Sequence, residues 1–492
     1  MKVIQISKLD NVAVALHPIK KGEEVTAGGI TVTALEDIPQ GHKIALKPIK
    51  NGENIIKYGF AIGHATADAE AGAWMHTHNV KTNLEGEMEY TYTPSLNFPE
   101  KVEPETFMGF RRKDGRAAIR NEIWIIPTVG CVNDIAKKMV HDNQDLVKGT
   151  IDGLYTFPHP FGCSQTGADH AQTRKLLAAL VRHPNAAAVL VLGLGCENLT
   201  HEQFLEELGD YDHDRVKFLT CQEVDDEFEV GRKLLEECSA YAAQFEREPI
   251  PVSELVVGMK CGGSDGLSGI TANPTVGRFS DMMAARGGST VLTEVPEMFG
   301  AETILMNRCQ TPELFDKTVC LINDFKNYFT SHNQTIYENP SPGNKKGGIS
   351  TLEDKSLGCT QKSGSAPVKG VLAYGEQVKT KGLNLLSAPG NDLVASTALA
   401  VSGAQIVLFT TGRGTPFASP VPTVKISSNS ALAGKKNNWI DFNAGRMVED
   451  KSKEELAKEL FEYVLAVASG KKVKAEEAGF HDMAIFKQGV TL

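Results

Sequence analysis

The sequence predicts a multidomain protein with a small N-terminal all-β domain followed by α/β domains with mainly parallel sheets. Three observations support this fold class. The chain has 492 residues, too many for one ordinary core. Its first part contains short apolar segments around glycines, and the remainder alternates apolar runs with amphipathic segments. We expect a β domain over residues 1–92, a linker over 93–107, and α/β domains over 108–248 and 249–492.

A weak internal repeat indicates the β domain. Its form is apolar-x-x-Gly-x-x-apolar, and its four copies occupy residues 19–25, 38–44, 49–55 and 69–75. Each copy is typical of two short strands joined by a turn that requires glycine. No long helix is expected in this part of the chain.

Two histidines, His76 and His78, directly follow the last copy of the repeat. On a strand this spacing places both imidazoles on one face, where they could share a divalent cation. Two solvated histidines on an edge strand are the alternative. His42 and Lys43 supply a further polar cluster from a neighbouring turn.

The linker is predicted from Pro94, Pro99 and Pro104, which interrupt a polar, acidic stretch that can be neither helix nor central strand. A basic cluster that includes Arg120 follows it. These charges are able to bind a carboxylate, although solvated charges on a turn are the commoner explanation.

Beyond the linker, three apolar runs each lead into a turn that contains a Gly-Cys pair, with Cys131, Cys163 and Cys196. This succession predicts a parallel βαβ sheet with a functional carboxyl edge. Thiols in such turns favour ligation or close approach of a substrate, and small residues that fit tight turns are the alternative. The Gly193-x-Gly195 pair lacks the third glycine of a dinucleotide fingerprint, so we do not expect nicotinamide binding.

The stretch at residues 255–265 is where we first expect chemistry. An apolar run leads into Cys261-Gly-Gly, a loop without bulky side chains that presents Cys261, Ser264 and Asp265. Open α/β sheets bind ligands at the carboxyl ends of their strands. A purely scaffolding turn is the alternative. Glu294 and Glu297 follow the next apolar run and could act as metal ligands, as acid or base, or as helix N-terminal charges.

Two later segments carry further signals. Residues 339–364 are polar and rich in glycine and proline, contain Cys359 and Lys362, and predict a long coil that covers a site. Residues 412–415 offer backbone N–H groups and a guanidinium as an anion cradle, without the lysine and spacing of a Walker A loop. A capping box, Ser452 with Glu455, predicts the start of the final helix.

Composition excludes some classes of partner. The net charge of -10 argues against nucleic acid or an anionic membrane as the main partner. No apolar run is long enough for a membrane span, and no secretion signal is visible. Nine cysteines without a C-x-x-C pair indicate reduced thiols and a cytoplasmic location. A small anionic substrate is compatible with this charge, and a homo-oligomer is left open.

Several longer strings together resemble the altronate/galactarate dehydratase family over essentially the whole chain. They lie at residues 41–43, 76–79, 120–122, 127–131, 155–165, 195–198, 261–265, 294–302, 338–344, 358–362 and 486–492. The one departure is Met75, where a smaller β-branched residue is expected. The resemblance implies an N-terminal SAF (β-clip) domain. It also implies an iron(II)-dependent hydro-lyase that converts D-altronate to 2-dehydro-3-deoxy-D-gluconate in hexuronate breakdown.

The reaction suggests a division of roles among the candidate residues. Removing a proton next to a carboxylate creates a second negative charge, and a divalent metal lowers that cost by several kcal/mol. We predict that His76 and His78 close over the sheet edge and hold the metal together with Cys163, Cys196 and Cys261. The catalytic candidates are His76, His78, Glu294 and Glu297; the substrate-binding candidates are Arg120, Arg278, Lys362, His42, Lys43, Ser264 and Asp265.

Three alternatives accompany this interpretation. Galactarate, a sugar diacid, is the alternative substrate on the same scaffold. An iron–sulfur cluster held by three cysteines is the alternative to mononuclear Fe(2+). A non-catalytic sugar-acid-binding protein is the alternative from another class.

Overall fold

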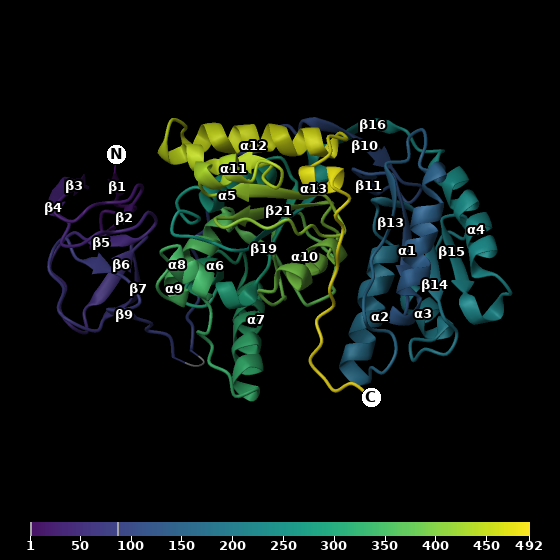
Figure 1. Cartoon of the computed structure of the whole chain (residues 1–492), viewed down its shortest axis with the longest axis horizontal. Coiled ribbons are helices and arrows are strands. Elements are labelled where there is room, and N and C mark those ends of the chain that lie inside the picture. The colour runs from purple at the N-terminus through teal and green to yellow at the C-terminus, as the bar shows by residue number, and fades with distance from the viewer. Residues whose placement is uncertain (1, 86–87) are drawn as a thin grey trace.

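The computed structural model describes residues 2–85 and 88–492. Three units lie in a row along the long axis of the molecule (Figure 1). A small β unit occupies one end, an α/β unit with a seven-stranded sheet lies in the middle, and an α/β unit with a four-stranded sheet occupies the other end. The predicted fold class is therefore confirmed.

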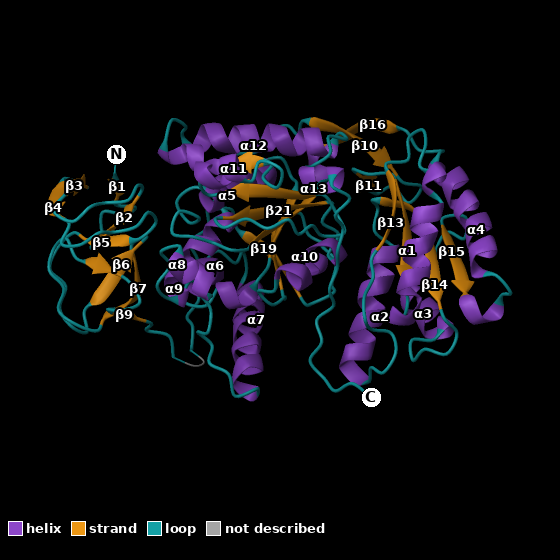
Figure 2. Ribbon diagram, viewed as in Figure 1, coloured by secondary structure: helices purple, strands orange, loops and turns teal. Residues whose placement is uncertain are grey.

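The β unit consists of short antiparallel strands (Figure 2). Its strands are β1 (Val3–Ile4), β2 (Val12–Ala15), β3 (Glu24–Ala27), β4 (Ile30–Thr33), β5 (Lys43–Ala45), β6 (Asn54–Lys57), β7 (Phe60–Ala65), β8 (Trp74–Met75) and β9 (Val80–Lys81). The repeat glycines have φ of 79° at Gly22, 82° at Gly41, 80° at Gly52 and 90° at Gly72, so the predicted turns do use the left-handed region that favours glycine.

The predicted strand through the two histidines is wrong. Strand β8 ends at Met75, and the chain then turns. The Asn79 side chain closes this turn, because its Oδ1 accepts from the His76 N–H at 2.9 Å and its Nδ2 donates to the Trp74 carbonyl at 3.0 Å. A local side-chain to backbone bond therefore replaces the strand pairing that a period-2 pattern suggests.

The predicted long coil over residues 339–364 is also wrong. It contains helices α8 (Pro342–Lys346) and α9 (Leu352–Cys359). Ser341 caps the first and Thr351 the second, each accepting a hydrogen bond from a backbone N–H of the first turn. The many glycines and prolines of this stretch favoured a coil, so the two helix caps were not predicted.

The end α/β unit contains a parallel sheet with the order β13-β12-β14-β15, as expected for βαβ units. Its strands are β12 (Glu122–Pro127), β13 (Gly153–Thr156), β14 (Ala186–Gly193) and β15 (Val216–Thr220); its helices are α1 (Asn133–Asp142), α2 (Gly167–Val181), α3 (His201–Leu208) and α4 (Glu227–Ala242). Apolar side chains of α1 and α4 cover one face of the sheet, and those of α2 cover the other.

A small antiparallel sheet lies where the chain enters and leaves this unit. It has the order β11-β10-β16 and consists of β10 (Thr106–Arg111), β11 (Ala117–Ala118) and β16 (Arg247–Pro251). The two α/β units also share a core, because α2 packs against α10 (Asp392–Val401) of the central unit. These two contacts join the α/β units.

The central unit contains a seven-stranded parallel sheet with the order β19-β20-β18-β17-β21-β22-β23. Its strands are β17 (Val256–Cys261), β18 (Ser289–Leu292), β19 (Val368–Leu372), β20 (Gly382–Leu386), β21 (Ile406–Thr411), β22 (Thr423–Ser427) and β23 (Phe442–Asn443). The chain runs from β17 to β18 on one side and later places β21 on the other side. Ligands of open α/β sheets bind outside such a switch point.

Helices cover both faces of the seven-stranded sheet. Apolar residues of α5 (Ala272–Ala285) and α12 (Lys453–Ala468) form the larger core on one face, and α10 packs on the other. The predicted capping box at Ser452 is confirmed. The remaining helices are α6 (Glu302–Met306), α7 (Pro312–Ser331), α11 (Ser430–Lys435) and α13 (Lys474–Glu477). Among the described residues, none of the helices combines the length and the apolar character needed to cross a membrane.

Candidate active site

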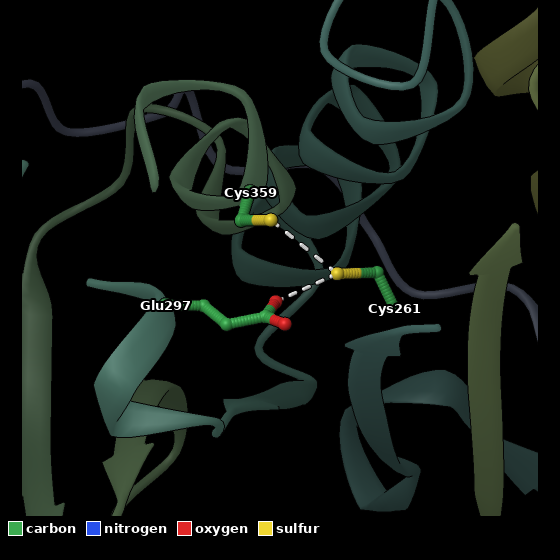
Figure 3. Close-up of side chains that lie close together, drawn as sticks. All are labelled: Cys261, Glu297 and Cys359. Carbon is green, nitrogen blue, oxygen red and sulfur yellow. Dashed lines mark hydrogen bonds between the residues drawn. The ribbon is translucent and has the colours of Figure 1, made fainter. Parts of the chain in front are cut away.

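Two thiols and a carboxylate meet at the carboxyl edge of the seven-stranded sheet (Figure 3). The Cys261 Sγ lies 2.8 Å from Glu297 Oε2 and 3.4 Å from the Cys359 Sγ. Cys261 is the last residue of β17, Glu297 belongs to the 3-10 turn after β18, and Cys359 ends α9. All three are buried, and one ligand atom from each lies within 4.8 Å of the other two. The group could therefore hold a metal ion.

Lysines and further carboxylates surround this group. Lys355 Nζ lies 2.7 Å from Glu297 Oε1. Lys260 Nζ lies 2.9 Å from Glu294 Oε1 and 2.5 Å from Asp392 Oδ1. Lys362 is buried as well; burial alone would lower the pKa of its ammonium, but the charges of both thiols and both glutamates raise it. Buried charges are tolerated only when they are paired, and here cations and anions alternate through the site.

The neighbouring groups shift the pKa values of the site. Hydrogen bonding with the Cys359 thiol lowers the pKa of Cys261 to about 6, and the same contact together with burial raises the pKa of Cys359. Burial alone would raise the pKa of Glu297, but Lys355 and Lys362 lower it to about 2. Burial and the nearby Glu297 raise the pKa of Glu294 well above its usual value. Adjacent groups in one pocket therefore differ strongly in acidity, as is typical of functional sites.

The backbone at Glu294 is strained. Its φ of 70° lies in the left-handed region, which costs a non-glycine residue roughly 1–3 kcal/mol. Its side chain compensates, because Oε2 accepts from the Cys261 N–H at 2.8 Å and Oε1 binds Lys260. The strain directs the carboxyl group back across the end of β17.

The β unit holds the helix that carries Cys359. Lys43 Nζ and Lys57 Nζ each lie 2.8 Å from one carboxylate oxygen of Asp354, which belongs to α9. A cavity beside Cys359 is lined by Lys57 and Tyr58 of the β unit and by Ser264 and Asp265 of the central unit. Its volume is about 10 Å³. This is room for one water molecule at most, so the site is closed.

Some predicted site residues lie together and others do not. Cys261, Glu294, Glu297 and Lys362 share the site. Ser264 and Asp265 line the adjoining cavity, and Lys43 lies at the docked face of the β unit. Within the described residues the buried Ser264 Oγ has no hydrogen-bond partner.

The three histidines form a cluster of their own around Trp74 of the β unit, where His42 meets α8 of the central unit. The ring of His76 stacks on Trp74 with centroids 5.6 Å apart, and His78 lies 5.1 Å from the same ring. His42 packs against His76 at 4.6 Å; its Nε2 donates to the Lys346 carbonyl at 3.2 Å, and its Nδ1 accepts from Trp74 Nε1 at 3.1 Å. None of the three belongs to the group of Cys261, Glu297 and Cys359.

The predicted single pocket of imidazoles and thiols does not form. Cys163 follows β13 and Cys196 follows β14, in the unit at the opposite end of the molecule from the β unit (Figure 1). The residues that we expected to converge lie at the ends of three different sheets. Sequence patterns identified the strand ends correctly, but they contain no information about which sheet each strand joins.

The predicted arginines lie elsewhere. The buried guanidinium of Arg120 binds Glu476 at 2.7 and 2.9 Å and donates to three backbone carbonyls, so its donors join structural elements. Arg278 is exposed on α5, whereas the candidate site is buried.

Sequence reasoning missed four members of the site, namely Cys359, Lys260, Lys355 and Asp392. Lys260 had a signal, because a lysine inside an apolar strand is rarely buried without a partner. Cys359 had a weaker one, its Gly-Cys pair three residues before Lys362.

Comparisons with known proteins agree with this architecture. Family models match residues 1–83 (altronate/galactarate dehydratase SAF domain), 109–243 (D-galactarate dehydratase/altronate hydrolase, second domain) and 252–491 (D-galactarate/altronate dehydratase, C-terminal). The first match confirms the predicted SAF type of the β unit.

Curated relatives match along the whole chain. An altronate dehydratase of Bacillus subtilis (strain 168) is 57% identical over 99% of both chains, and one of Escherichia coli (strain K12) is 53% identical over 100% of both. A galactarate dehydratase (L-threo-forming) of Escherichia coli (strain K12) is 33% identical over 98% of this chain and 96% of its own. The chain belongs to the altronate/galactarate dehydratase family of hydro-lyases.

Proposed function

We propose that this dehydratase acts on D-altronate and releases water and 2-dehydro-3-deoxy-D-gluconate. The observation that carries the proposal is the buried group of Cys261, Glu297 and Cys359, with paired lysines, at the switch point of the central sheet. The choice of substrate rests on the relatives. The two at 57% and 53% identity are named altronate dehydratases, and the galactarate dehydratase is 33% identical.

The reaction needs positive charge near the substrate carboxylate. A base removes the proton at C2, the electron pair forms the C2=C3 bond, and the C3 hydroxyl leaves with a proton as water. The resulting enol takes up a proton at C3 and becomes the 2-keto acid. Charge builds up on the carboxylate as the C2 proton leaves. The ammonium groups of Lys260, Lys355 and Lys362 are preorganised, buried cations that can stabilise that charge.

The donor set suits iron(II). The Cys261 Sγ and a Glu297 oxygen face each other at 2.8 Å, so once the thiol loses its proton two negative atoms are in contact unless a cation joins them. Thiolate and carboxylate ligands are compatible with iron(II), and Cys261, Cys359 and Glu297 would hold it. When bound, the ion supplies a Lewis acid for a carboxylate or hydroxyl oxygen of the substrate.

A chain of charged groups connects the buried site to solvent. Glu294 binds Lys260, and Lys260 binds Asp392, whose side chain is 35% exposed. We assign Glu294 as the group that exchanges a proton with the substrate, with Lys260 and Asp392 returning that proton to solvent. Proton transfer of this kind requires groups within hydrogen-bond distance, and both contacts meet that requirement.

Substrate entry requires a larger opening than the structure contains. The cavity beside Cys359 has about 10 Å³, whereas a six-carbon acid is many times larger than one water molecule. The β unit contributes Lys57 and Tyr58 to the wall of this cavity. Separation of the β unit from α9 would therefore open the site.

The test is an anaerobic assay of the purified chain with D-altronate and with galactarate, with and without added iron(II). We expect the 2-keto acid only with iron, and faster turnover of altronate. Glu297→Gln and Cys261→Ser should abolish turnover, whereas the matched variant Cys309→Ser, a buried thiol that contacts Thr318, should retain it.

Each contrary outcome removes one part of the proposal. Full turnover of Glu297→Gln would exclude this site. A galactarate rate equal to or above the altronate rate would overturn the substrate assignment. Affinity for altronate without any product would favour the non-catalytic alternative.

A further inference from the structure

Three free cysteines follow three neighbouring strands of the end α/β unit. Cys131 follows β12, Cys163 follows β13 and Cys196 follows β14. These strands are parallel and adjacent in the order β13-β12-β14, so their carboxyl ends share one edge. All three thiols are exposed, unlike Cys261 and Cys359. The proposed altronate site does not use this edge, because it lies in the central unit.

The three turns that carry these cysteines are bonded to one another. The first and second are joined by the Gly130 N–H and the Phe161 carbonyl at 2.9 Å. The second and third are joined by the Leu199 N–H with the Gly162 carbonyl at 2.9 Å and by the Ser164 N–H with Asn198 Oδ1 at 2.7 Å. The third and first are joined by Thr128 Oγ1 and Glu197 Oε1 at 3.0 Å. The three cysteines therefore belong to one packed assembly of turns.

The glycines before the cysteines make this packing possible. A Cβ at Gly162, whose φ is +94°, would lie 1.9 Å from the Thr128 carbonyl oxygen. A Cβ at Gly130 would lie 2.9 Å from the His159 carbonyl oxygen. Both distances are too short for a side chain, so glycine is required for the turns to approach each other.

Polar donors accompany the thiols. Gln222 Nε2 donates to the Cys196 Sγ at 3.5 Å. Gln165, two residues after Cys163, is only 3% exposed, and within the described residues its Nε2 has no hydrogen-bond partner. N–H donors near cysteine sulfurs are characteristic of iron–sulfur sites, where they tune the cluster.

The spacing of the sulfurs excludes a compact single-ion site. The three sulfurs do not all lie within 4.8 Å of one another, and among the described residues no histidine or carboxylate completes a compact ligand group with them. A zinc ion with bonds of about 2.3 Å to sulfur would hold its ligands closer than that. A set of sulfur ligands alone selects zinc, copper(I) or iron–sulfur clusters, and in an iron–sulfur cluster the cysteines bind separate iron atoms.

We infer that Cys131, Cys163 and Cys196 bind a [4Fe–4S] cluster at the carboxyl edge of the four-stranded sheet. Three cysteines leave one iron without a protein thiolate, and that iron is open to a water or carboxylate oxygen. A cavity of about 170 Å³, lined by Thr128, Gly193, Gly195 and Glu197 among others, adjoins the same turns. It lies beside the first and third of these turns.

Cys221 is a natural control. It follows β15 at the same edge, but it is buried in the apolar core with Leu219 and residues of α4. A buried thiol of this kind behaves as a small apolar side chain. Cys320 on α7 is a second control, because it is exposed but has no cysteine turn beside it.

The test measures iron and acid-labile sulfide in the full chain purified without oxygen, together with the visible spectrum and the electron paramagnetic resonance signal after reduction with dithionite. We expect about four sulfide ions per chain, as a [4Fe–4S] cluster contains. Cys131→Ser, Cys163→Ser and Cys196→Ser should each lose most of the sulfide, whereas Cys221→Ala and Cys320→Ser should retain it. Circular dichroism would check that each variant is folded.

Three outcomes would overturn the inference. They are absence of sulfide from the anaerobic protein, zinc or iron without sulfide, and loss of sulfide in Cys221→Ala to the same extent as in the three variants. Cys261→Ser and Cys359→Ser should keep the sulfide while losing altronate turnover. The cluster and the proposed function are therefore tested separately.

Discussion

The docking of the β unit gives the sharpest prediction. Asp354 is shared by Lys43 and Lys57, each 2.8 Å away, and all three side chains are at most 2% exposed. Asp354→Asn leaves two buried ammonium groups without their counter-charge. Removing one partner of a buried pair costs about 3–5 kcal/mol. We expect the free energy of unfolding to fall by an amount within this range. Burial already lowers the pKa of Lys43, so this lysine can lose its proton in the variant, and the cost does not exceed the range.

The assay compares this variant with Asp37→Asn in the same unit. Asp37 also binds a lysine, Lys20, at 2.8 Å, but the two side chains are 60% and 77% exposed. An exposed pair contributes about 0–1 kcal/mol. Urea unfolding, together with hydrogen exchange of the β unit, would report the two losses. If Asp354→Asn destabilised the protein by no more than Asp37→Asn, the buried pair would not hold the β unit on α9.

Three further predictions concern pH, metal content and turn geometry. Burial raises the pKa of Glu122 from 4.5 to about 8, so this group opposes folding increasingly as pH rises from 4.5 toward 8. Glu122→Gln, whose amide oxygen can still accept from Trp124, should therefore stabilise the protein by about 3 kcal/mol at pH 7 and by little at pH 5, as measured by urea unfolding at both values. His78→Ala should leave the non-sulfide iron content unchanged, because His78 lies on Trp74, outside the group of Cys261, Glu297 and Cys359; loss of that iron by metal analysis would return the histidine to the site. Gly162→Ala should destabilise the end unit through a clash with the Thr128 carbonyl, whereas Gly149→Ala, also at positive φ but with open space around it, should cost only the backbone strain; equal thermal stability of the two variants would contradict this.

The sequence by itself determined the local features of the protein. Gly22, Gly41, Gly52 and Gly72 predicted their turns, because positive φ is a property of one residue and its neighbours. The Gly-Cys pairs at Cys131, Cys163 and Cys196 correctly marked strand ends, whereas the pair at Cys359 lies at the end of helix α9. The capping box at Ser452 marked a helix start. Where a local hydrogen bond competed with a periodic pattern, as at Asn79 after Trp74, the prediction failed.

Only the tertiary structure decided which residues meet. Cys261 and Cys359 are 98 positions apart, and Asp354 is 311 positions from Lys43; both contacts depend on sheet order and on the docking of the β unit. The arrangement of the sheets also separates His76 and His78 from Cys163 and Cys196, although the sequence predicted that these residues hold one metal together. Strand periodicity and turn chemistry depend on near neighbours, whereas strand order depends on packing over the whole chain. The sequence therefore predicted that reactive side chains lie at the carboxyl ends of strands. The order of the strands in the packed sheets determined which of these side chains lie at the same sheet edge.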